Sequence, residues 1–218
     1  MSGATGKTQT ESAPSVKERL LSDVLSGKFR SGEWLKQVDL ESAYGANRFE
    51  VRIALSEMAA RHLIDHIPNR GYRVIDPSDR ERADLYELRT IVETGAARLV
   101  AQRVTEDDIE ELSVLVDEFA AAINDKGQDE FSRLNVKFHN QFYEICGNPL
   151  MVSQIQELRQ RGIPGRRGGW DAIAGRRASC EDHQRMVEML RTKDADGLCY
   201  VVYNHLNRWR EFSRPDSE

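Results

Sequence analysis

Three of the five histidines lie in the C-terminal half of the chain, within segments whose residue pattern predicts helices. His139 follows Asn135 by four residues, so on one helix both side chains leave the same face. His183 and His205 belong to the last two predicted helices, each of which can turn its histidine inward. Three imidazoles that converge inside a helical bundle would form a divalent-metal site, because imidazole suits zinc, nickel and similar ions. The alternative is three unrelated helix histidines that are hydrogen-bonded or solvated.

Two arginines near the N-terminus form a second group of residues suited to binding. Arg48 and Arg52 are one helical turn apart, on the face opposite to the apolar residues Val51, Leu55 and Met58. At the N-terminal end of the second helix of a helix-turn-helix, two guanidinium groups meet base edges and phosphates in the major groove. The alternative is a solvated charged face in which Arg52 pairs with Glu50 or Glu57.

The elements that position these arginines follow from apolar spacing and from turn residues. Helices are predicted at 18–25 and at 38–44, the second ended by Gly45. Asn47 and Glu50 fit a capping box, in which each side chain satisfies a free backbone N–H at the start of the next helix. These elements predict two helices joined by a tight turn, preceded by one more helix.

A hairpin is predicted at 63–75, with a polar turn at Asn69, Arg70 and Gly71. With the helices before it, the hairpin completes a winged helix-turn-helix of three helices and a small β-hairpin, which we place at 16–76. Arg70 at the hairpin tip suits a phosphate or minor-groove contact. The alternative for Arg70 is an ordinary surface arginine in a turn.

Pro77 and Ser78 interrupt the pattern and mark the expected domain boundary. Beyond it, helical periodicity without a convincing strand predicts an antiparallel all-helical bundle of six to seven helices at 79–214. The chain as a whole is therefore expected to be mainly α. Residues 162–177 are rich in Gly and Arg and break the pattern, but they lack the Gly-Lys-Ser/Thr of a phosphate loop. We expect this stretch to be a mobile connection or a pocket lid rather than a nucleic-acid contact.

The composition excludes several classes of protein. The 218 residues are 39% hydrophobic and 31% charged, which is ordinary for a chain with a buried core. No apolar run approaches the roughly 18 residues of a transmembrane helix. Residues 1–15 lack the apolar region of a signal peptide and are expected to be a disordered arm. Three cysteines, an odd number, argue against a disulfide framework. We therefore expect a cytoplasmic protein that contacts no membrane.

The net charge of −5 is unevenly distributed. Residues 1–78 carry 11 Lys and Arg against 10 Asp and Glu, whereas residues 79–218 carry 20 against 26. A small, nearly neutral domain still binds DNA when its basic groups share one face. The charge alone neither supports nor excludes DNA binding, so the residue pattern has to decide.

The stretch from Val16 to Val74 resembles the DNA-binding domain of the GntR family of bacterial regulators. The matching segments are SG…GEWL, VDLESAYG, NRFEVRIALSEMAARHLI and PNRGYRV. The family usually has Ser-Arg-Thr-Pro-Val-Arg-Glu-Ala-Leu at 47–55. This chain keeps both arginines but has Phe49 and Glu50 for Thr and Pro, and Ile53 for Glu. The operator preference of the family is therefore not carried over. The resemblance and the motif together imply DNA contacts at Lys36, Asn47, Arg48, Phe49, Arg52, Asn69, Arg70 and Gly71.

Residues 80–210 resemble the ligand-binding domain of the FadR-like subfamily, called FCD. The matching segments are YELRTIVETGAARLVA, LNVKFHNQFYEICGNPLM and EDHQRMVEMLRTKDADG, followed by a histidine on the last helix. The resemblance implies four metal ligands, Asn135, His139, His183 and His205, with zinc or nickel as the expected ion. Arg89 matches an arginine that lines the effector pocket, although it could instead form a surface ion pair with Glu93, four residues on.

Three functions compete for this chain: a ligand-controlled DNA-binding regulator, a metal-dependent enzyme with a histidine cluster in a helical bundle, and a structural helical adaptor. A hydrolytic enzyme needs a general base beside its metal, and no HExxH helix or nucleophile elbow is present. An adaptor has no use for the paired arginines and the wing. We therefore expect a transcription regulator, acting as a repressor, that binds a short palindromic operator as a homodimer. Its effector is expected to be a small organic acid held at the metal-containing pocket.

Overall fold

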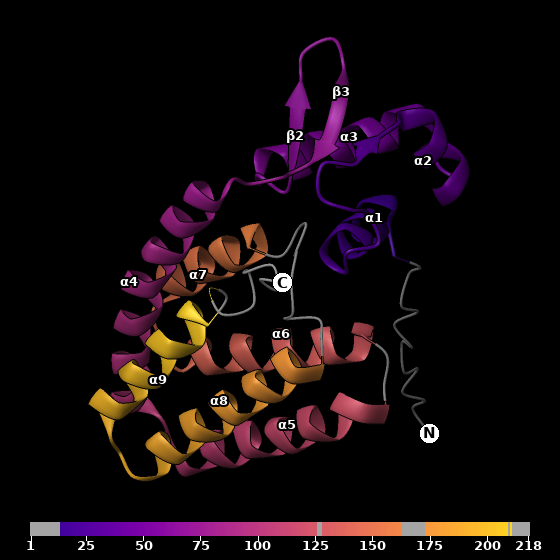
Figure 1. The fold of residues 1–218 in the computed structure, drawn as a ribbon. Helices are drawn as coiled ribbons and strands as arrows, with labels where there is room; N and C mark the ends of the chain where they lie inside the picture. Colours follow the sequence, from indigo (N-terminus) through magenta and orange to yellow (C-terminus); the bar gives the residue numbers. More distant parts are fainter. Residues whose placement is uncertain (1–13, 126–127, 163–172, 209, 211–218) are drawn as a thin grey trace, which may run out of the picture.

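The computed structural model describes residues 14–125, 128–162, 173–208 and 210. Figure 1 shows two parts, a small head that carries a β-hairpin and a larger bundle of helices. The long helix α4 (Asp79–Arg103) begins directly after the hairpin and runs along one side of the bundle. Most of the predicted N-terminal arm lies outside the described residues. Ser15, which we assigned to that arm, is instead the N-cap of the first helix.

The head contains three helices and three short strands: α1 (Val16–Leu25), β1 (Trp34–Leu35), α2 (Gln37–Tyr44), α3 (Arg48–Ala60), β2 (Ile64–Ile67) and β3 (Gly71–Val74). Gly45 ends α2 as predicted, in a left-handed conformation with φ of 59° that a residue without Cβ adopts freely. The predicted capping box at the start of α3 is also confirmed. Asn47 Oδ1 accepts hydrogen bonds from the N–H groups of Phe49 and Glu50, and Glu50 accepts one from Asn47 N–H.

The sheet of the head has one strand more than the predicted hairpin. Its order is β1-β3-β2 with antiparallel pairing throughout, and Trp34 and Leu35 of β1 lie opposite Arg73 and Tyr72 of β3. A strand of two residues is too short to show the alternation of polar and apolar side chains that reveals a strand in a sequence. The third strand therefore exists only through its pairing with β3.

The head has a hydrophobic core of its own, to which all three helices and all three strands contribute. The helix-turn-helix is fixed to this core by fully buried side chains of α3, among them Val51, Ala54 and Leu55. Burying such side chains provides the main stabilisation of a small domain. The face of α3 that carries Arg48 and Arg52 is consequently held outward.

Beyond the head, the described residues form six helices: α4 (Asp79–Arg103), α5 (Glu106–Asp125), α6 (Gln128–Glu144), α7 (Pro149–Arg161), α8 (Ile173–Arg191) and α9 (Ala195–Asn207). Ser78 caps α4 through another capping box, with Glu81. In the bundle, α4 packs against α9, α7 and α6, while α5 packs against α6 and α8. Figure 1 shows α5, α6 and α8 side by side with their axes roughly aligned.

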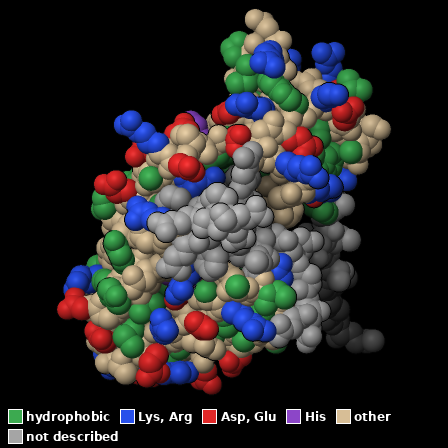
Figure 2. All heavy atoms as spheres, in the orientation of Figure 1, with side chains coloured by type: hydrophobic (Ala, Val, Ile, Leu, Met, Phe, Trp, Pro, Cys, Tyr) green, Lys and Arg blue, Asp and Glu red, His purple; other side chains and the backbone are tan. Residues whose placement is uncertain are grey.

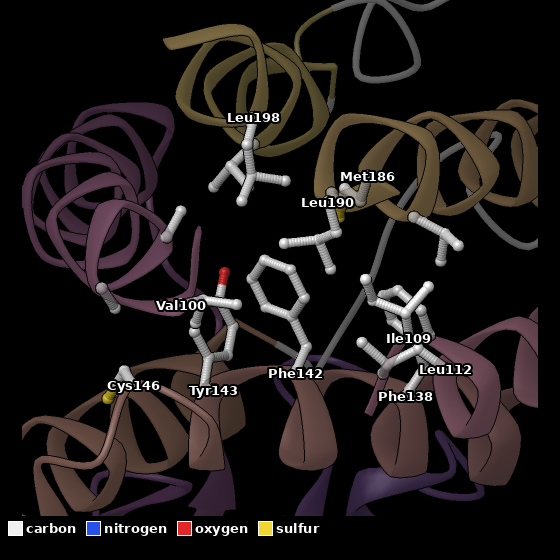
Figure 3. Packing of buried hydrophobic residues seen from close by; sticks show 14 of the residues in the cluster. Val100, Ile109, Leu112, Phe138, Phe142, Tyr143, Cys146, Met186, Leu190 and Leu198 are labelled. Atoms are coloured by element: carbon white, nitrogen blue, oxygen red, sulfur yellow. The ribbon is translucent and has the colours of Figure 1, made fainter. Parts of the chain in front are cut away.

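Aromatic and aliphatic side chains fill the interior of the bundle. Figure 3 shows Phe138, Phe142 and Tyr143 of α6 pointing toward side chains of the other helices. Phe138 and Phe142 are completely buried, and Leu112, Met186 and Leu190 from α5 and α8 are at most 1% exposed. The core therefore locks α6 and α8, the two helices that carry His139 and His183, against each other.

The structure corrects the expected break in helical structure at the Gly- and Arg-rich stretch. Two other predicted segments fall outside the described residues. Helix α8 begins at Ile173, so residues 173–177 of the Gly- and Arg-rich stretch are helical rather than a break in the pattern. A single helix-interior glycine such as Gly175 costs only about 1 kcal/mol, which the packing of the helix offsets. Residues 163–172, and residues 209 and 211–214 at the end of the predicted bundle, lie outside the described residues. Within the described part of the chain, no helix is both long and apolar enough to cross a membrane.

Candidate metal and DNA-binding sites

The three predicted histidines meet in the interior of the bundle. His139 lies on α6, His183 on α8 and His205 on α9, and their exposed fractions are 1%, 0% and 9%. The Nε2 atoms of His139 and His183 are 3.1 Å apart, and one nitrogen from each of the three rings lies within 4.8 Å of the others. The structure thus rules out three unrelated histidines. The sequence placed each residue on the correct helix, and the packing of the bundle brings them together.

A buried carboxylate orients the third imidazole. Asp182 Oδ2 lies 3.2 Å from His205 Nδ1, and Arg208 binds the same carboxylate through two nitrogens at 2.6 and 2.9 Å. A carboxylate on Nδ1 fixes the tautomer in which Nε2 carries the lone pair, an arrangement common around metal-bound histidines. The role of Asp182 was not predicted from the sequence. Its position directly before His183 was the available signal, but spacing does not reveal which of two adjacent side chains supports a ligand on another helix.

Burial keeps the imidazoles neutral. Loss of solvation lowers the pKa of His139 and His183 well below the usual value, and the positive charge of Arg159 lowers it further. Burial also lowers the pKa of His205, although Asp182 partly opposes this effect. Only the neutral imidazole offers a lone pair to a metal, so the cluster is in the protonation state that binding requires.

Asn135 supplies an oxygen beside the histidines. It lies one helical turn before His139 on α6, and its Oδ1 atom is buried without a hydrogen-bond partner among the described residues. It lines the same small cavity, of about 40 Å³, as His205 and Arg89. A buried acceptor left unpaired costs about 1–3 kcal/mol, so a cation or a donor at this point would remove a penalty.

The cluster fits a metal ion after a small contraction. Two nitrogens bound to one zinc ion at about 2.1 Å cannot be more than roughly 4.2 Å apart. The separation of 3.1 Å between His139 and His183 meets this limit, whereas the widest separation of 4.8 Å exceeds it by about half an ångström. A side-chain rotation closes a gap of this size without moving a helix. The three histidines therefore fit a single ion, and Asn135 is the candidate oxygen ligand on the same helix as His139.

Arg89 is in the interior of the bundle, not on the helix surface. Its Nε atom donates to Glu93 Oε1 at 2.7 Å, so the ion pair considered from the sequence does form, but it is buried. Arg159 of α7 and the hydroxyl of Tyr143 bind the other oxygen of Glu93 at 3.2 and 2.7 Å. Two guanidinium groups thus share one carboxylate, which leaves an excess of one positive charge beside the histidines. Arg89 was predicted from the sequence, whereas the burial of Glu93 and the roles of Arg159 and Tyr143 were not.

The predicted DNA-contacting residues are divided between α3, the start of α2 and the hairpin. Arg48, Phe49 and Arg52 are exposed on α3, Asn47 caps that helix, and Lys36 is exposed at the N-cap of α2. In Figure 2, Lys and Arg side chains are spread over the visible face of the head, with hydrophobic side chains among them.

The alternative explanation for the two arginines is not supported. Glu50 uses its carboxylate in the capping box, and Glu57 forms an ion pair with Lys17 at 2.7 Å. Within the described chain, Arg48 and Arg52 form no ion pair. Both guanidinium groups therefore remain available to an external anion.

The hairpin tip has the backbone expected of a tight turn. Asn69 and Gly71 have positive φ values of 62° and 100°, and the exposed Arg70 lies between them. The guanidinium of Arg70 stacks over the ring of Trp34, 4.7 Å from its centroid. This contact restricts the orientation of Arg70 and links the tip to β1, so Arg70 is more constrained than an ordinary arginine in a surface turn.

Comparison with known proteins matches the head and the helical bundle each to a known domain family. Residues 13–74 match the model of "Bacterial regulatory proteins, gntR family", and residues 84–208 match the FCD domain. The Nta operon transcriptional regulator of Aminobacter aminovorans is 27% identical over 84% of this chain and 86% of its own length. The transcriptional repressor NanR of Cronobacter sakazakii is 26% identical over 88% and 81%. The fold matches that of Escherichia coli McbR/YncC with a TM-score of 0.77, at 21% identity over 88% of this chain and 92% of that one.

These matches cover nearly all of the described chain, and the helix-turn-helix and the helical bundle each correspond to one of the two matched models. The relatives named above are regulators of transcription. The chain therefore belongs to the GntR family, with an FCD domain after its DNA-binding domain, and it is a transcriptional regulator and not an enzyme.

Proposed function

We propose that this regulator is a ligand-controlled repressor. It binds a short palindromic operator as a homodimer through its N-terminal domain, residues 16–76. Its second domain, residues 79–214, holds a divalent metal and a small carboxylate effector, and binding of the effector releases the operator. The observation that carries this proposal is a cluster of three buried imidazoles, one of which, that of His205, lines a small cavity together with the unpaired amide oxygen of Asn135 and two guanidinium groups.

Zinc or nickel is the proposed ion. Both accept several imidazole nitrogens, and Irving–Williams ordering favours them over manganese or iron at such a site. The proposed ligands are Asn135, His139, His183 and His205. An asparagine oxygen brings no charge, so this set neutralises less of the ion's charge than one containing Asp. When bound, the ion would supply a positive charge that holds an anionic effector in place.

The chemistry of the cavity supports a small acid as the effector. Arg89 and Arg159 provide two positive charges against the single carboxylate of Glu93, and the metal would add more. A planar carboxylate matches the fork of a guanidinium group and balances the excess charge. The cavity of about 40 Å³ holds only a few water-sized groups, which favours a small hydroxy acid or dicarboxylate over a fatty acyl chain.

The junction of head and bundle offers a route for control. A second cavity, of about 310 Å³, is lined by residues of the head such as Asp65, by Pro77, and by residues of α4 and α7. Tyr86 of α4 lines this cavity and the effector pocket as well. A shift of Tyr86 on effector binding would alter the packing at the junction, and a coupling of about 1–3 kcal/mol is enough to release an operator.

Two adjacent helices support a homodimer. Helices α4 and α9 pack together, and each carries two exposed large apolar side chains, which are Leu88, Ile91, Tyr200 and Tyr203 with exposed fractions of 47–67%. Apolar surface gathered on neighbouring helices is typical of a protein–protein interface. An isologous dimer would present two copies of α3, as a palindromic operator requires.

The role of the arginines is tested by replacing both. Arg48→Ala combined with Arg52→Ala is expected to weaken binding at least about 30-fold, because contacts of this kind contribute about 1–3 kcal/mol each. The salt dependence should become shallower as fewer counterions are released. Fluorescence anisotropy with duplexes selected from a random pool by the parent protein measures both effects.

The control for this pair is Arg98→Ala combined with Arg133→Ala, which removes the same charge from exposed positions of the bundle. This control should bind like the parent. Parental affinity in the Arg48 and Arg52 variant, at unchanged helical content, would contradict the assignment.

The metal site is tested by titrating zinc or nickel into protein purified without a polyhistidine tag and freed of metal. About one ion per chain should bind, and His183→Ala should abolish binding while His66→Ala, at an exposed histidine of the head, preserves it. Asn135→Asp should bind more tightly because it adds a negative charge. Protein that takes up neither metal refutes the site.

The pH dependence of this binding follows from the lowered pKa values. Protons compete with the metal only when the imidazoles become protonated, and burial lowers the pKa of His139 and His183 well below 6.5. Occupancy should therefore stay constant as the pH falls through about 6.5 and decline only in more acidic solution. A decline centred on the pKa of a free imidazole would mean solvated histidine ligands.

The effector is tested by a thermal-shift screen of small organic acids, with and without a chelator. A matching acid at a hundredfold excess over its Kd should raise Tm by about 5–10 °C, and only in the presence of metal. Arg89→Ala should keep its metal and its fold, because Arg159 and Tyr143 still bind Glu93, but should lose the response. Arg98→Ala, on the same helix, should keep it. Stabilisation by uncharged compounds only, or a full response in Arg89→Ala, would contradict this account of the pocket.

A further inference from the structure

The exposed face of α3 carries large apolar side chains that the head itself does not cover. Phe49 is 62% exposed and Ile53 is 40% exposed. In the described part of the head, Val38 of α2 is the one other large hydrophobic residue with comparable exposure. Water around such side chains is unfavourable by about 25 cal/mol per Å² of apolar area, so a partner that covers them gains binding energy.

The two side chains form a short strip on one face of the helix. Phe49 and Ile53 are four residues apart, so one lies above the other. The buried residues Val51, Ala54, Leu55 and Met58 occupy the opposite face. Arg48 and Arg52 each directly precede a member of the strip, so the apolar strip lies beside two unpaired positive charges at the N-terminal end of α3.

The side chains on this face of α3 suit the groups that a DNA duplex presents. The two guanidinium groups match the phosphates or guanine edges of a duplex, and the nearest carboxylate on the helix, that of Glu50, is already used in the capping box. In the major groove, the one apolar group that a standard base presents is the C5-methyl group of thymine. An aromatic ring and a branched aliphatic side chain cannot hydrogen-bond to base edges, but they can enclose a methyl group.

We propose that Phe49 and Ile53 read thymine, by packing against its C5-methyl group in each half-site of the operator. This inference rests on the DNA binding proposed above and adds the base chemistry that the operator must carry. Phe49, in the first turn of α3, makes the main contact, and Ile53 closes the apolar enclosure one turn further along. Arg48 and Arg52 position the helix, and the apolar pair supplies part of the discrimination between sequences.

Removal of a single methyl group tests the proposal. Duplexes are selected from a random pool by the full-length protein, and each thymine of a selected duplex is then replaced in turn by deoxyuridine, which pairs identically but lacks the methyl group. For the parent protein, this replacement at one thymine position of each half-site should lower the affinity for the duplex about fourfold, since burial of one such carbon is worth about 0.8 kcal/mol. Phe49→Ala should bind the thymine and uracil duplexes equally.

Three variants make the comparison specific. Ile53→Ala should reduce the preference for thymine over uracil only in part. Leu150→Ala, which removes an 81% exposed apolar side chain from the bundle, should retain the full preference. Arg48→Ala should weaken binding to both duplexes by the same factor, because it does not touch the methyl group.

Other outcomes overturn the proposal in distinguishable ways. If duplexes are selected but no thymine is sensitive to loss of its methyl group, or Phe49→Ala keeps the parental preference, the reading of thymine is wrong and DNA binding stands. If Phe49→Ala instead alters the association state seen by sedimentation and leaves the preference unchanged, the strip is an interface with another protein copy. If the parent selects no duplex, DNA binding itself fails, and this inference fails with it.

Discussion

The free-energy cost of burying polar groups away from solvent is the main constraint on how the helices of the bundle pack. His139 and His183 are at most 1% exposed and stay neutral, Asp182 and Glu93 are equally buried, and each of these carboxylates is bound by arginine. An isolated buried charge is far more costly than a paired one, so every helix that contributes to this cluster depends on the others. The Nδ1 atoms of His139 and His183 and the oxygen of Asn135 nevertheless lack partners among the described residues. A cation or a donor that binds the oxygen of Asn135 would offset part of this cost.

The same constraint connects the bundle with the head. The buried cluster draws on α4, α6, α7, α8 and α9, and α4 leads directly into the β-hairpin (Figure 1). Around the cluster, the aromatic core holds the helices rigidly, so a change of charge in the pocket cannot be absorbed by loose packing (Figure 3). Movement is then expected where packing is weakest, at the cavity of about 310 Å³ between head and bundle. In the proposed mechanism, a small ligand in the bundle changes the position of α3 relative to DNA through this junction.

Local signals predicted most of the fold. Gly45 and the pair Asn47 and Glu50 act within a few residues, so the ends of α2 and α3 could be read directly from the sequence. Strand β1 could not, because it depends on pairing with β3, about 40 residues away in the chain.

The same distinction between local signals and long-range contacts applies to the histidine cluster and its surroundings. The histidines were found by residue type and by resemblance to a family. Asp182, Arg159 and Tyr143 were not, since their roles arise from contacts between helices, and nothing in their local spacing sets them apart from surface residues. Arg89 and Glu93 show the limit most clearly. Their spacing predicts the ion pair but not its burial, and burial turns a weak surface contact into a determinant of the pocket.

The central claim, that three imidazoles from three helices hold one ion, is tested most directly by X-ray absorption spectroscopy of the zinc-loaded protein. The account predicts three imidazole nitrogens at about 2.0–2.1 Å, with the remaining ligands oxygen. A shell with fewer than three imidazoles, or one containing sulfur from a cysteine, would contradict it.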